Sequence, residues 1–375
     1  MALVLTEEQS MLQESAREFL QKKAPVNHLR GLRDQGSTSG FDPALWQEMS
    51  AMGWPAMIIA EAYAGLGFGY TGMGLVLQEA GRTLTPSPLF SSGLVAASAF
   101  ELLGSEAQKA SWLPQIAGGS VIFSLAWDES TRYQPFAINT TANSYGKGYR
   151  LNGSKLGVID GMGASHFLVI ARMDGDEDLG LFVVAADQAG LSRSGSQALD
   201  THVLANLRLS NVELDTTACL GTGPVATSEL NRLLDIACIG QSAELLGVAL
   251  EAFERTMNYL KERKQFGVPV GSFQALQHRA AMLYTDLEMC KSLVLNALQL
   301  LDEGQQQLSQ TASCCKAKLS EVAMRATAEA IQMHGGIGMT DEFEIGFFYK
   351  RARILETLLG DRYYHLDRFA LQRGY

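Results

Sequence analysis

Hydrophobic residues change their spacing twice along the chain of 375 residues. Up to about residue 119 they recur at helical spacing. From about residue 120 to 222 the period falls towards two, which is typical of strands, and from about residue 224 helical spacing returns. The pattern therefore predicts an α+β fold with an N-terminal α-helical domain (1–119), a middle antiparallel β-domain (120–223) and a C-terminal α-helical bundle (224–375).

Residues with special backbone preferences mark the predicted elements. Thr6, Asp42 and Ser105 each stand before a helical pattern and are expected to cap it, and a polar turn is expected at 301–310 between two long helices. Five runs in the middle segment read as strands bounded by Gly, Asn and Asp. They are SVIFSLAW (120–127), YRLNGSKLGVI (149–159), HFLVIARM (166–173), GLFVVAA (180–186) and VLANLRLSNVEL (203–214).

Composition narrows the class of protein. A hydrophobic content of 47% with 19% charged residues is that of a soluble globular chain, and the net charge of -10 argues against nucleic-acid binding. Five cysteines at irregular spacing indicate reduced thiols and no metal site. The N-terminus lacks a signal peptide, and no apolar run reaches the ~18 residues of a membrane-spanning helix. We therefore expect a cytoplasmic protein with no membrane span.

Four stretches carry a family resemblance. They are AEAYAGLGFG (60–69), LQEAGRTL (77–84), YLKERKQFGVPVGSFQALQHRAAML (259–283) and QMHGGIGMTDEFEIGFFYKRARI (332–354). Together with the α–β–α order they resemble the acyl-CoA dehydrogenase family of flavoproteins. The chain is most similar to a divergent branch with small subunits of the pimeloyl-CoA dehydrogenase type and steroid side-chain enzymes. The resemblance implies a β-barrel-like middle domain and a C-terminal four-helix bundle.

The same resemblance implies FAD-dependent oxidation of an acyl-CoA thioester to the trans-2-enoyl-CoA, with electrons passed to an electron-transfer flavoprotein. It implies that a neighbouring subunit completes each FAD site, so a homo-oligomer or an α2β2 assembly with a sister subunit is expected. A solvated helix end capped by Gly267 is the alternative for Arg263, and core packing is the alternative for Met333 and His334. The implied FAD contacts in the C-terminal part are Arg263, Gln265, Phe266, Gln274, Gln332, Met333, His334, Gly335 and Gly336.

Two flavin-contacting segments depart from the family pattern. The loop that carries a hydroxyl in the family reads LAWDES here, so Ala126 and Asp128 lie at this contact, with Asp128 in the hydroxyl position. On the strand whose Trp and Thr flank the flavin, Gly157 and Ile159 take their places. These contacts are absent or rebuilt, and Gly157 opens space for a bulky acyl group.

The catalytic glutamate is missing from both positions that the family uses. Its E-G-T triplet falls on Leu359, Gly360 and Asp361, and the alternative D-x-E-R pattern begins at Asp235 and ends at Cys238. An apolar side chain cannot take the Cα proton. Three interpretations remain: Asp361 is the base, the base lies on a sister subunit, or Asp235 or Asp128 serves. In each, the backbone N–H of Leu359 would bind the thioester oxygen.

Two other classes of function remain open. One is a non-catalytic partner subunit, which keeps the fold and an interface but turns over nothing, and it predicts little or no tightly held flavin in the chain purified alone. A flavin oxidase or monooxygenase of the same fold is the other alternative, and it predicts oxygen consumption in excess of electron transfer.

Overall fold

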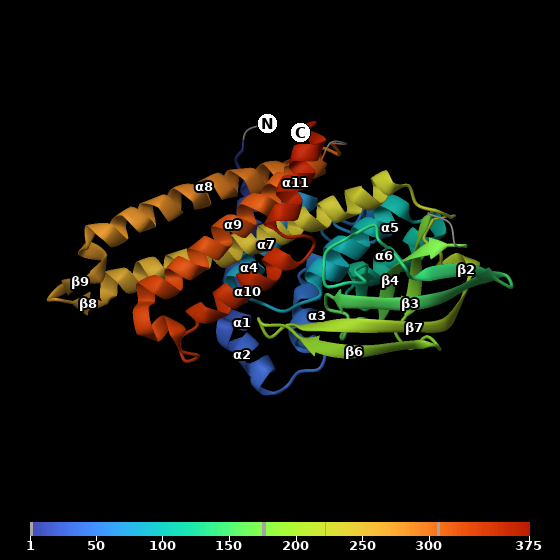
Figure 1. The fold of residues 1–375 in the computed structure, drawn as a ribbon, viewed down its shortest axis with the longest axis horizontal. Coiled ribbons are helices and arrows are strands. Elements are labelled where there is room, and N and C mark those ends of the chain that lie inside the picture. The colour runs from blue at the N-terminus through green and yellow to red at the C-terminus, as the bar shows by residue number, and fades with distance from the viewer. Residues whose placement is uncertain (1–2, 175–177, 222, 306–307) are drawn as a thin grey trace. The chain divides into compact units, whose positions relative to one another are not determined.

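The computed structural model describes residues 3–174, 178–221, 223–305 and 308–375 (Figure 1). The chain forms two compact units. The helical unit consists of Met1–Arg30, Tyr70–Thr85 and Cys238–Tyr375, and the sheet unit consists of Gly31–Gly69 and Pro86–Ala237. The division into three domains that the sequence predicts stays a prediction.

The helical unit is built from long helices that begin and end at recognisable residues. Thr6 caps the first helix through a capping box with Gln9, as expected. A turn separates α8 from α9 as predicted, although Gln306 and Gln307 lie outside the described residues. The elements are α1 (Glu7–Lys23), the start of α2 (Val26–Asp34), α4 (Tyr70–Thr83), most of α7 (Thr227–Glu262), β8 (Lys264–Gln265), β9 (Val268–Pro269), η5 (Val270–Ser272), α8 (Gln274–Asp302), α9 (Ser309–His334), η6 (Gly335–Met339), α10 (Ile345–Thr357) and α11 (Arg362–Gln372).

Helices α4 and α7 cross at backbone contact. A Cβ atom on Gly81 of α4 would collide with the carbonyl of Glu244, and one on Gly247 of α7 would collide with the carbonyl of Gln78. Glycine at both positions therefore permits an approach that any side chain would prevent.

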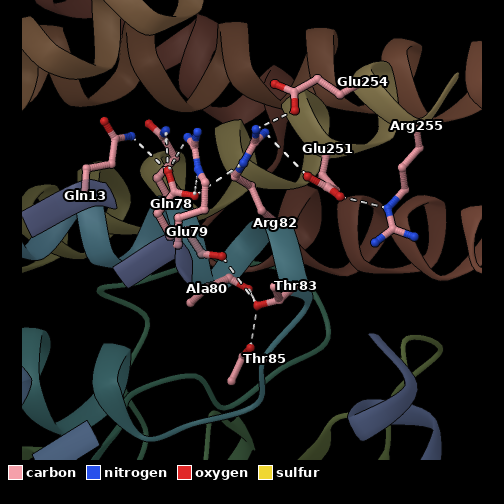
Figure 2. Close-up of polar contacts among 11 residues, drawn as sticks. Gln13, Gln78, Glu79, Ala80, Arg82, Thr83, Thr85, Glu251, Glu254 and Arg255 are labelled. Atoms are coloured by element: carbon pink, nitrogen blue, oxygen red, sulfur yellow. Dashed lines mark hydrogen bonds and ion pairs between the residues drawn. The ribbon is translucent and has the colours of Figure 1, made fainter. Parts of the chain in front are cut away.

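An ion-pair network lies along the same two helices (Figure 2). Glu79, whose side chain is 1% exposed, accepts a hydrogen bond from Gln13 at 2.9 Å and pairs with Arg82 at 3.3 Å. Arg82 also pairs with Glu254 at 2.6 Å and with Glu251 at 3.6 Å. Arg17 also donates to the Glu79 carboxylate at 3.0 and 3.1 Å. Because Glu79 and Arg82 are both buried, the loss of either one would leave the other with fewer partners of opposite charge.

The sheet unit carries short helices and one sheet. Asp42 and Ser105 cap their helices with side-chain oxygens, as predicted. The elements are α3 (Pro43–Ala51), η1 (Trp54–Ala56), η2 (Glu61–Tyr63), η3 (Leu89–Ala96), α5 (Ala97–Leu103), α6 (Glu106–Ala117), β1 (Phe123–Ala126), β2 (Thr141–Tyr145), β3 (Gly148–Val158), β4 (His166–Met173), β5 (Leu179–Ala185), β6 (Leu191–Gln197), β7 (Val203–Asp215) and η4 (Thr216–Ala218).

The sheet is mixed, which corrects the expectation of an antiparallel domain. Its seven strands follow the order β1-β4-β2-β3-β7-β6, with β5 paired to β4. Strand β4 runs parallel to β1, with Leu125 opposite Leu168, and parallel to β2. The remaining pairs in this sheet are antiparallel. Parallel neighbours need long connections, and no local pattern in the sequence reports them.

Five of the described strands of this sheet coincide with predicted runs, and two do not. Strands β2 and β6 were missed because their residues are largely polar and exposed, so they lack the alternation that marks a half-buried strand. Buried side chains from β1, β2, β3, β4, β5 and β7, among them Phe167 and Phe182, form the core of the sheet unit.

One helix, α7, is long and apolar enough to cross a membrane by length and composition. Its most apolar window is buried throughout inside the structure. This helix therefore has the character of a core helix.

Candidate active site

The loop between α10 and α11 carries the three residues at the predicted catalytic triplet. Helix α10 ends at Thr357, and Leu358 follows in an extended conformation. Leu359 and Gly360 then adopt positive φ angles of 58° and 95°. A left-handed conformation is unusual for leucine, so the surrounding structure has to hold this turn in place.

Asp361 is the N-cap of α11. Its carboxylate accepts a hydrogen bond of 2.8 Å from the backbone N–H of Tyr364, and the residue is exposed. The carboxylate is therefore engaged in starting a helix. Asp361 as the catalytic base stays a prediction.

A buried imidazole holds the carbonyl of the same turn. His365, on α11, is 1% exposed, and its Nε2 atom is 2.9 Å from the carbonyl oxygen of Leu359. The thiol of Cys238 on α7 approaches this oxygen at 3.8 Å. Burial, together with the nearby Lys316 ammonium, lowers the pKa of His365 to about 3. The imidazole is thus neutral at physiological pH, and its Nε2–H donates the hydrogen bond.

A buried lysine lies at the end of α10. Lys316 of α9 is fully buried, and its Nζ donates to the carbonyls of Leu355 and of Glu356, the latter at 3.3 Å. Burial lowers the pKa of this ammonium to about 8. Lys316 therefore takes the place of the backbone donors that would otherwise serve these last carbonyls.

The predicted arginine–aromatic segment forms a hairpin. Strands β8 and β9 pair through Gln265 and Val268, and the two residues between them have positive φ angles, 53° at Phe266 and 81° at Gly267. This is the geometry of a two-residue hairpin turn. Gly267 accordingly belongs to the turn and does not cap α7. Phe266 is 92% exposed, and Arg263 at the start of the hairpin is exposed too.

The last turns of α7 and α9, which lead into the hairpin and the glycine run, contact each other in the helical unit. Tyr259 on α7 stacks on His334 of α9 at 4.3 Å between ring centroids, and its hydroxyl donates to the carbonyl of His334 at 3.2 Å. In Figure 1 the β8–β9 hairpin lies beyond the end of α7. The structure thus brings together two helix ends that the sequence separates by 75 residues.

The glycine run contains both buried and exposed residues. His334 is buried, with its Nδ1 atom 2.7 Å from the carbonyl of Ala330, and Met333 is buried as well. Both pack between helices, as the alternative interpretation expected. Gln332, Gly335 and Gly336 are exposed, and a Cβ atom on either glycine would meet nothing within 4 Å. The exposed backbone at these glycines is open to a ligand. Gln274, the first residue of α8, is also exposed.

In the sheet unit, Asp128 follows β1 next to a buried ion pair. Lys155 of β3 is fully buried and pairs with Glu129 at 2.7 Å. Burial raises the pKa of Asp128 to about 6, although the Lys155 ammonium opposes this shift. Asp128 therefore changes its charge close to physiological pH.

Two other predicted flavin contacts lie on or beside β3. Gly157 has a φ angle of 62°, its N–H donates to the side chain of Asn206 at 3.1 Å, and a Cβ atom there would meet nothing within 4 Å. The carbonyl of Ile159 accepts a hydrogen bond from the hydroxyl of Ser124. Ala126 ends β1 and is fully buried. The structure therefore leaves open space beside Gly157, whereas the buried Ala126 presents no exposed surface to a ligand.

Asp235, the remaining candidate base, lies on α7 with 1% exposure.

Two cavities of the described chain contain none of the predicted site residues. One, of about 780 Å³ in the sheet unit, includes Trp112 and His166 in its lining, and one of about 240 Å³ in the helical unit includes Arg17 and Arg82.

Two known domain families match the chain. The acyl-CoA dehydrogenase C-terminal domain matches residues 230–372, which include the hairpin, the glycine run and the Leu359 loop. The acyl-CoA dehydrogenase N-terminal domain matches residues 6–120. This chain belongs to the acyl-CoA dehydrogenase family.

Relatives of this acyl-CoA dehydrogenase cover almost its whole length. The mitochondrial short/branched chain specific acyl-CoA dehydrogenase of Rattus norvegicus is 29% identical over 361 residues, which cover 93% of this chain and 82% of the relative. A variant of the Tcur3481-Tcur3483 steroid ACAD is 31% identical, with a TM-score of 0.89 and 98% of each chain covered. The ChsE4-ChsE5 complex from Mycobacterium tuberculosis is 25% identical, with a TM-score of 0.91 and coverage of 100% and 99%.

Membership of the family makes this chain an oxidoreductase that acts on CH–CH donors and uses FAD. The helical unit fits such a cofactor, because it presents an exposed guanidinium at Arg263, an exposed aromatic ring at Phe266 and open backbone at Gly335 and Gly336. The departures from the family pattern expected at Asp128 and Gly157 stay predictions.

Sequence analysis overlooked the two residues that contact the Leu359 loop from inside. Lys316 stands in the run SCCKAKL, and a lysine within a largely apolar stretch of a helix is a signal of burial. His365 gave no such signal, because its partner is a backbone carbonyl that only the folded loop brings near.

Proposed function

We propose that this chain is the base-lacking subunit of an acyl-CoA dehydrogenase built from two kinds of chain. The observation that supports this most is the loop at Leu359, which places an apolar side chain at the turn and engages the next carboxylate, Asp361, as a helix cap. A sister subunit would then supply the carboxylate that takes the Cα proton. The heteromeric ChsE4-ChsE5 complex of the same fold is consistent with such an arrangement.

The residues of this chain would bind and orient. Arg263 would pair with the diphosphate of FAD, and the backbone of Gly335 and Gly336 would lie against it. FAD held there would supply the acceptor for the hydride of the acyl Cβ, with the electrons passed on to an electron-transfer flavoprotein. The backbone N–H of Leu359 would bind the thioester oxygen, which gains negative charge as the Cα proton leaves.

One observation favours a second candidate, a self-sufficient dehydrogenase in which Asp128 is the base. Burial raises the pKa of Asp128 to about 6, which suits a general base near neutral pH. In this alternative the chain forms a homo-oligomer and needs no sister carboxylate.

The open space beside Gly157 supports a bulky acyl group as the substrate class, such as a steroid side chain or a dicarboxylate. A series of acyl-CoA thioesters that differ in length and bulk tests this. Equal or better turnover of short unbranched acyl groups would contradict it.

The five free cysteines support a reducing compartment, and we place the assembly in the cytoplasm.

The deciding experiment compares the chain purified alone with the chain co-purified with a sister acyl-CoA dehydrogenase subunit. We expect low FAD content and no anaerobic bleaching of the flavin by acyl-CoA in the chain alone, and both properties in the pair. Stoichiometric FAD and bleaching in the chain alone would contradict the two-chain proposal, and loss of both in an Asp128→Asn variant would then support the second candidate. Oxygen consumption in excess of electron transfer would instead indicate an oxidase or monooxygenase.

A further inference from the structure

The two carbonyls that Lys316 contacts have a particular relation to the catalytic loop. In an α-helix each carbonyl accepts the N–H of the residue four positions later. The carbonyls of Leu355 and Glu356 would therefore accept from Leu359 and Gly360 if α10 continued. Lys316 Nζ donates to both carbonyls instead. One ammonium thus replaces the two backbone donors of the loop.

The displaced donors remain without partners. Within the described part of the chain, the N–H groups of Leu359 and Gly360 donate no hydrogen bond, although the preceding N–H of Leu358 bonds to the carbonyl of Ile354 at 3.1 Å. Gly360 is a buried residue. Buried backbone N–H groups without partners are rare, because each one costs about as much as a lost hydrogen bond. The buried N–H of Gly360, directly after that of the half-buried Leu359 at a left-handed turn, points to an acceptor from outside the chain.

His365 fixes the direction in which one of these donors points. Its Nε2–H holds the carbonyl oxygen of Leu359 at 2.9 Å. In a trans peptide the N–H of the next residue lies opposite the carbonyl. The N–H of Gly360 therefore points away from the imidazole and from Cys238 behind it.

We propose that Lys316 and His365 are positioning residues that keep the N–H groups of Leu359 and Gly360 free and aimed at one oxygen atom. The identity of this oxygen rests on the proposed function: it is the thioester oxygen of acyl-CoA, which becomes an enolate oxygen when the Cα proton leaves. The site then has two backbone donors, with Gly360 as the second one. It needs no side chain at position 359, so it stays intact in a chain that has lost its carboxylate.

The test uses Lys316→Met, which has a similar length but no donor. The freed carbonyls of Leu355 and Glu356 can then accept the N–H groups of Leu359 and Gly360, so the loop closes as another helical turn. Hydrogen exchange of the peptide over residues 355–362 should slow in this variant. Arg368→Gln is the matched control, because Arg368 ties α11 to Ser313 and Ser309 of α9 at 3.3 and 3.2 Å.

The binding readout compares octanoyl-CoA with S-octyl-CoA, the thioether that lacks the carbonyl oxygen, on the flavin-loaded protein with its sister chain where one is required. Wild type and Arg368→Gln should prefer the thioester, and Lys316→Met should lose about tenfold or more of that preference, as expected for two hydrogen bonds. An unchanged preference in Lys316→Met would overturn the proposal while leaving the proposed function standing.

Two further outcomes remain informative. If Lys316→Met does not fold, His365→Gln and His365→Leu decide the matter: the glutamine keeps a donor and should retain the thioester preference, and equal behaviour of the two variants would contradict the role of His365. If the wild type binds neither CoA compound, the proposed function fails. Hydrogen exchange then decides on its own, because rapid exchange at Leu359 and Gly360 that Lys316→Met does not slow would refute the freeing of these donors.

Discussion

The imidazole of His365 donates to the carbonyl of Leu359 over 2.9 Å, and burial keeps this imidazole neutral. Its pKa is lowered to about 3, from 6.5 in the unfolded chain, by burial, with Lys316 and Arg368 adding to the shift and Asp361 opposing it. Between these two values the unfolded chain binds a proton that the folded chain does not. The free energy of unfolding therefore falls as the pH drops below 6.5.

We expect His365→Gln to remove this loss. Between pH 7 and pH 5 the wild type should lose about 2 kcal/mol more than the variant. Urea unfolding at both pH values measures the difference. His278→Gln, which changes an exposed histidine of α8, is the control and should follow the wild type. Parallel pH curves for wild type and His365→Gln would show that the buried imidazole does not couple folding to protons.

Leu359→Glu should give the chain its own base. The backbone already has the left-handed turn and its free N–H groups, so only the carboxylate is missing. We expect acyl-CoA-dependent reduction of the flavin to rise by a factor of about 10² or more, within the range for a general base. Leu359→Gln has the same shape without a base and should remain at the wild-type rate. Equal rates for the two variants would mean that position 359 does not face the Cα proton.

Asp128→Asn should flatten the pH dependence of the flavin midpoint potential near pH 6. In the wild type, Asp128 gains its negative charge as the pH rises through its pKa of about 6, and a nearby negative charge disfavours a reduced flavin. The wild-type potential should therefore fall more steeply than that of the variant around this pH. Redox titrations at pH 5 and pH 7 measure the slopes. Identical slopes would place Asp128 away from the flavin.

Arg82→Met should destabilise the helical unit strongly. It removes one of the two arginines that pair with the buried Glu79 and the arginine that Glu79 shares with Glu251 and Glu254. Loss of one member of a buried ion pair costs about 3–5 kcal/mol, and the remaining Arg17 offsets part of this cost. Arg33→Ala, which removes a pair with the exposed Asp34, should cost about 1 kcal/mol or less. Denaturant unfolding compares the two. A similarly small loss in Arg82→Met would mean that Arg17 alone compensates for the charge of Glu79.

Arg263→Ala should weaken FAD retention and leave the fold intact, because the side chain is exposed and its removal disturbs no core packing. We expect FAD to dissociate about tenfold faster or more, as for a lost charge-assisted contact. Lys261→Ala, an exposed cation one half-turn earlier on α7, is the control. Flavin content after gel filtration and circular dichroism together separate loss of cofactor from loss of structure.

Local sequence patterns predicted the helix caps and the apolar strands of this fold. The caps at Thr6, Asp42 and Ser105 and the five apolar strands could be read from the sequence, because a cap residue or an alternating run acts within a few positions. The parallel partner of β1 could not be predicted, since β4 begins 40 residues after the last residue of β1. The role of Lys316 likewise depends on a helix end 39 residues away. Side chains that serve backbone atoms leave little trace in the sequence.

The β8–β9 hairpin has a consequence for how a cell must make this protein. The two-residue turn holds the Phe266 ring almost fully exposed to water. The isolated chain therefore presents an exposed aromatic side chain that its own core does not cover. Chaperones and quality-control proteases recognise such side chains. Balanced synthesis of this chain and whatever covers Phe266 would therefore govern its yield, and overproduction of the chain alone would favour inclusion bodies.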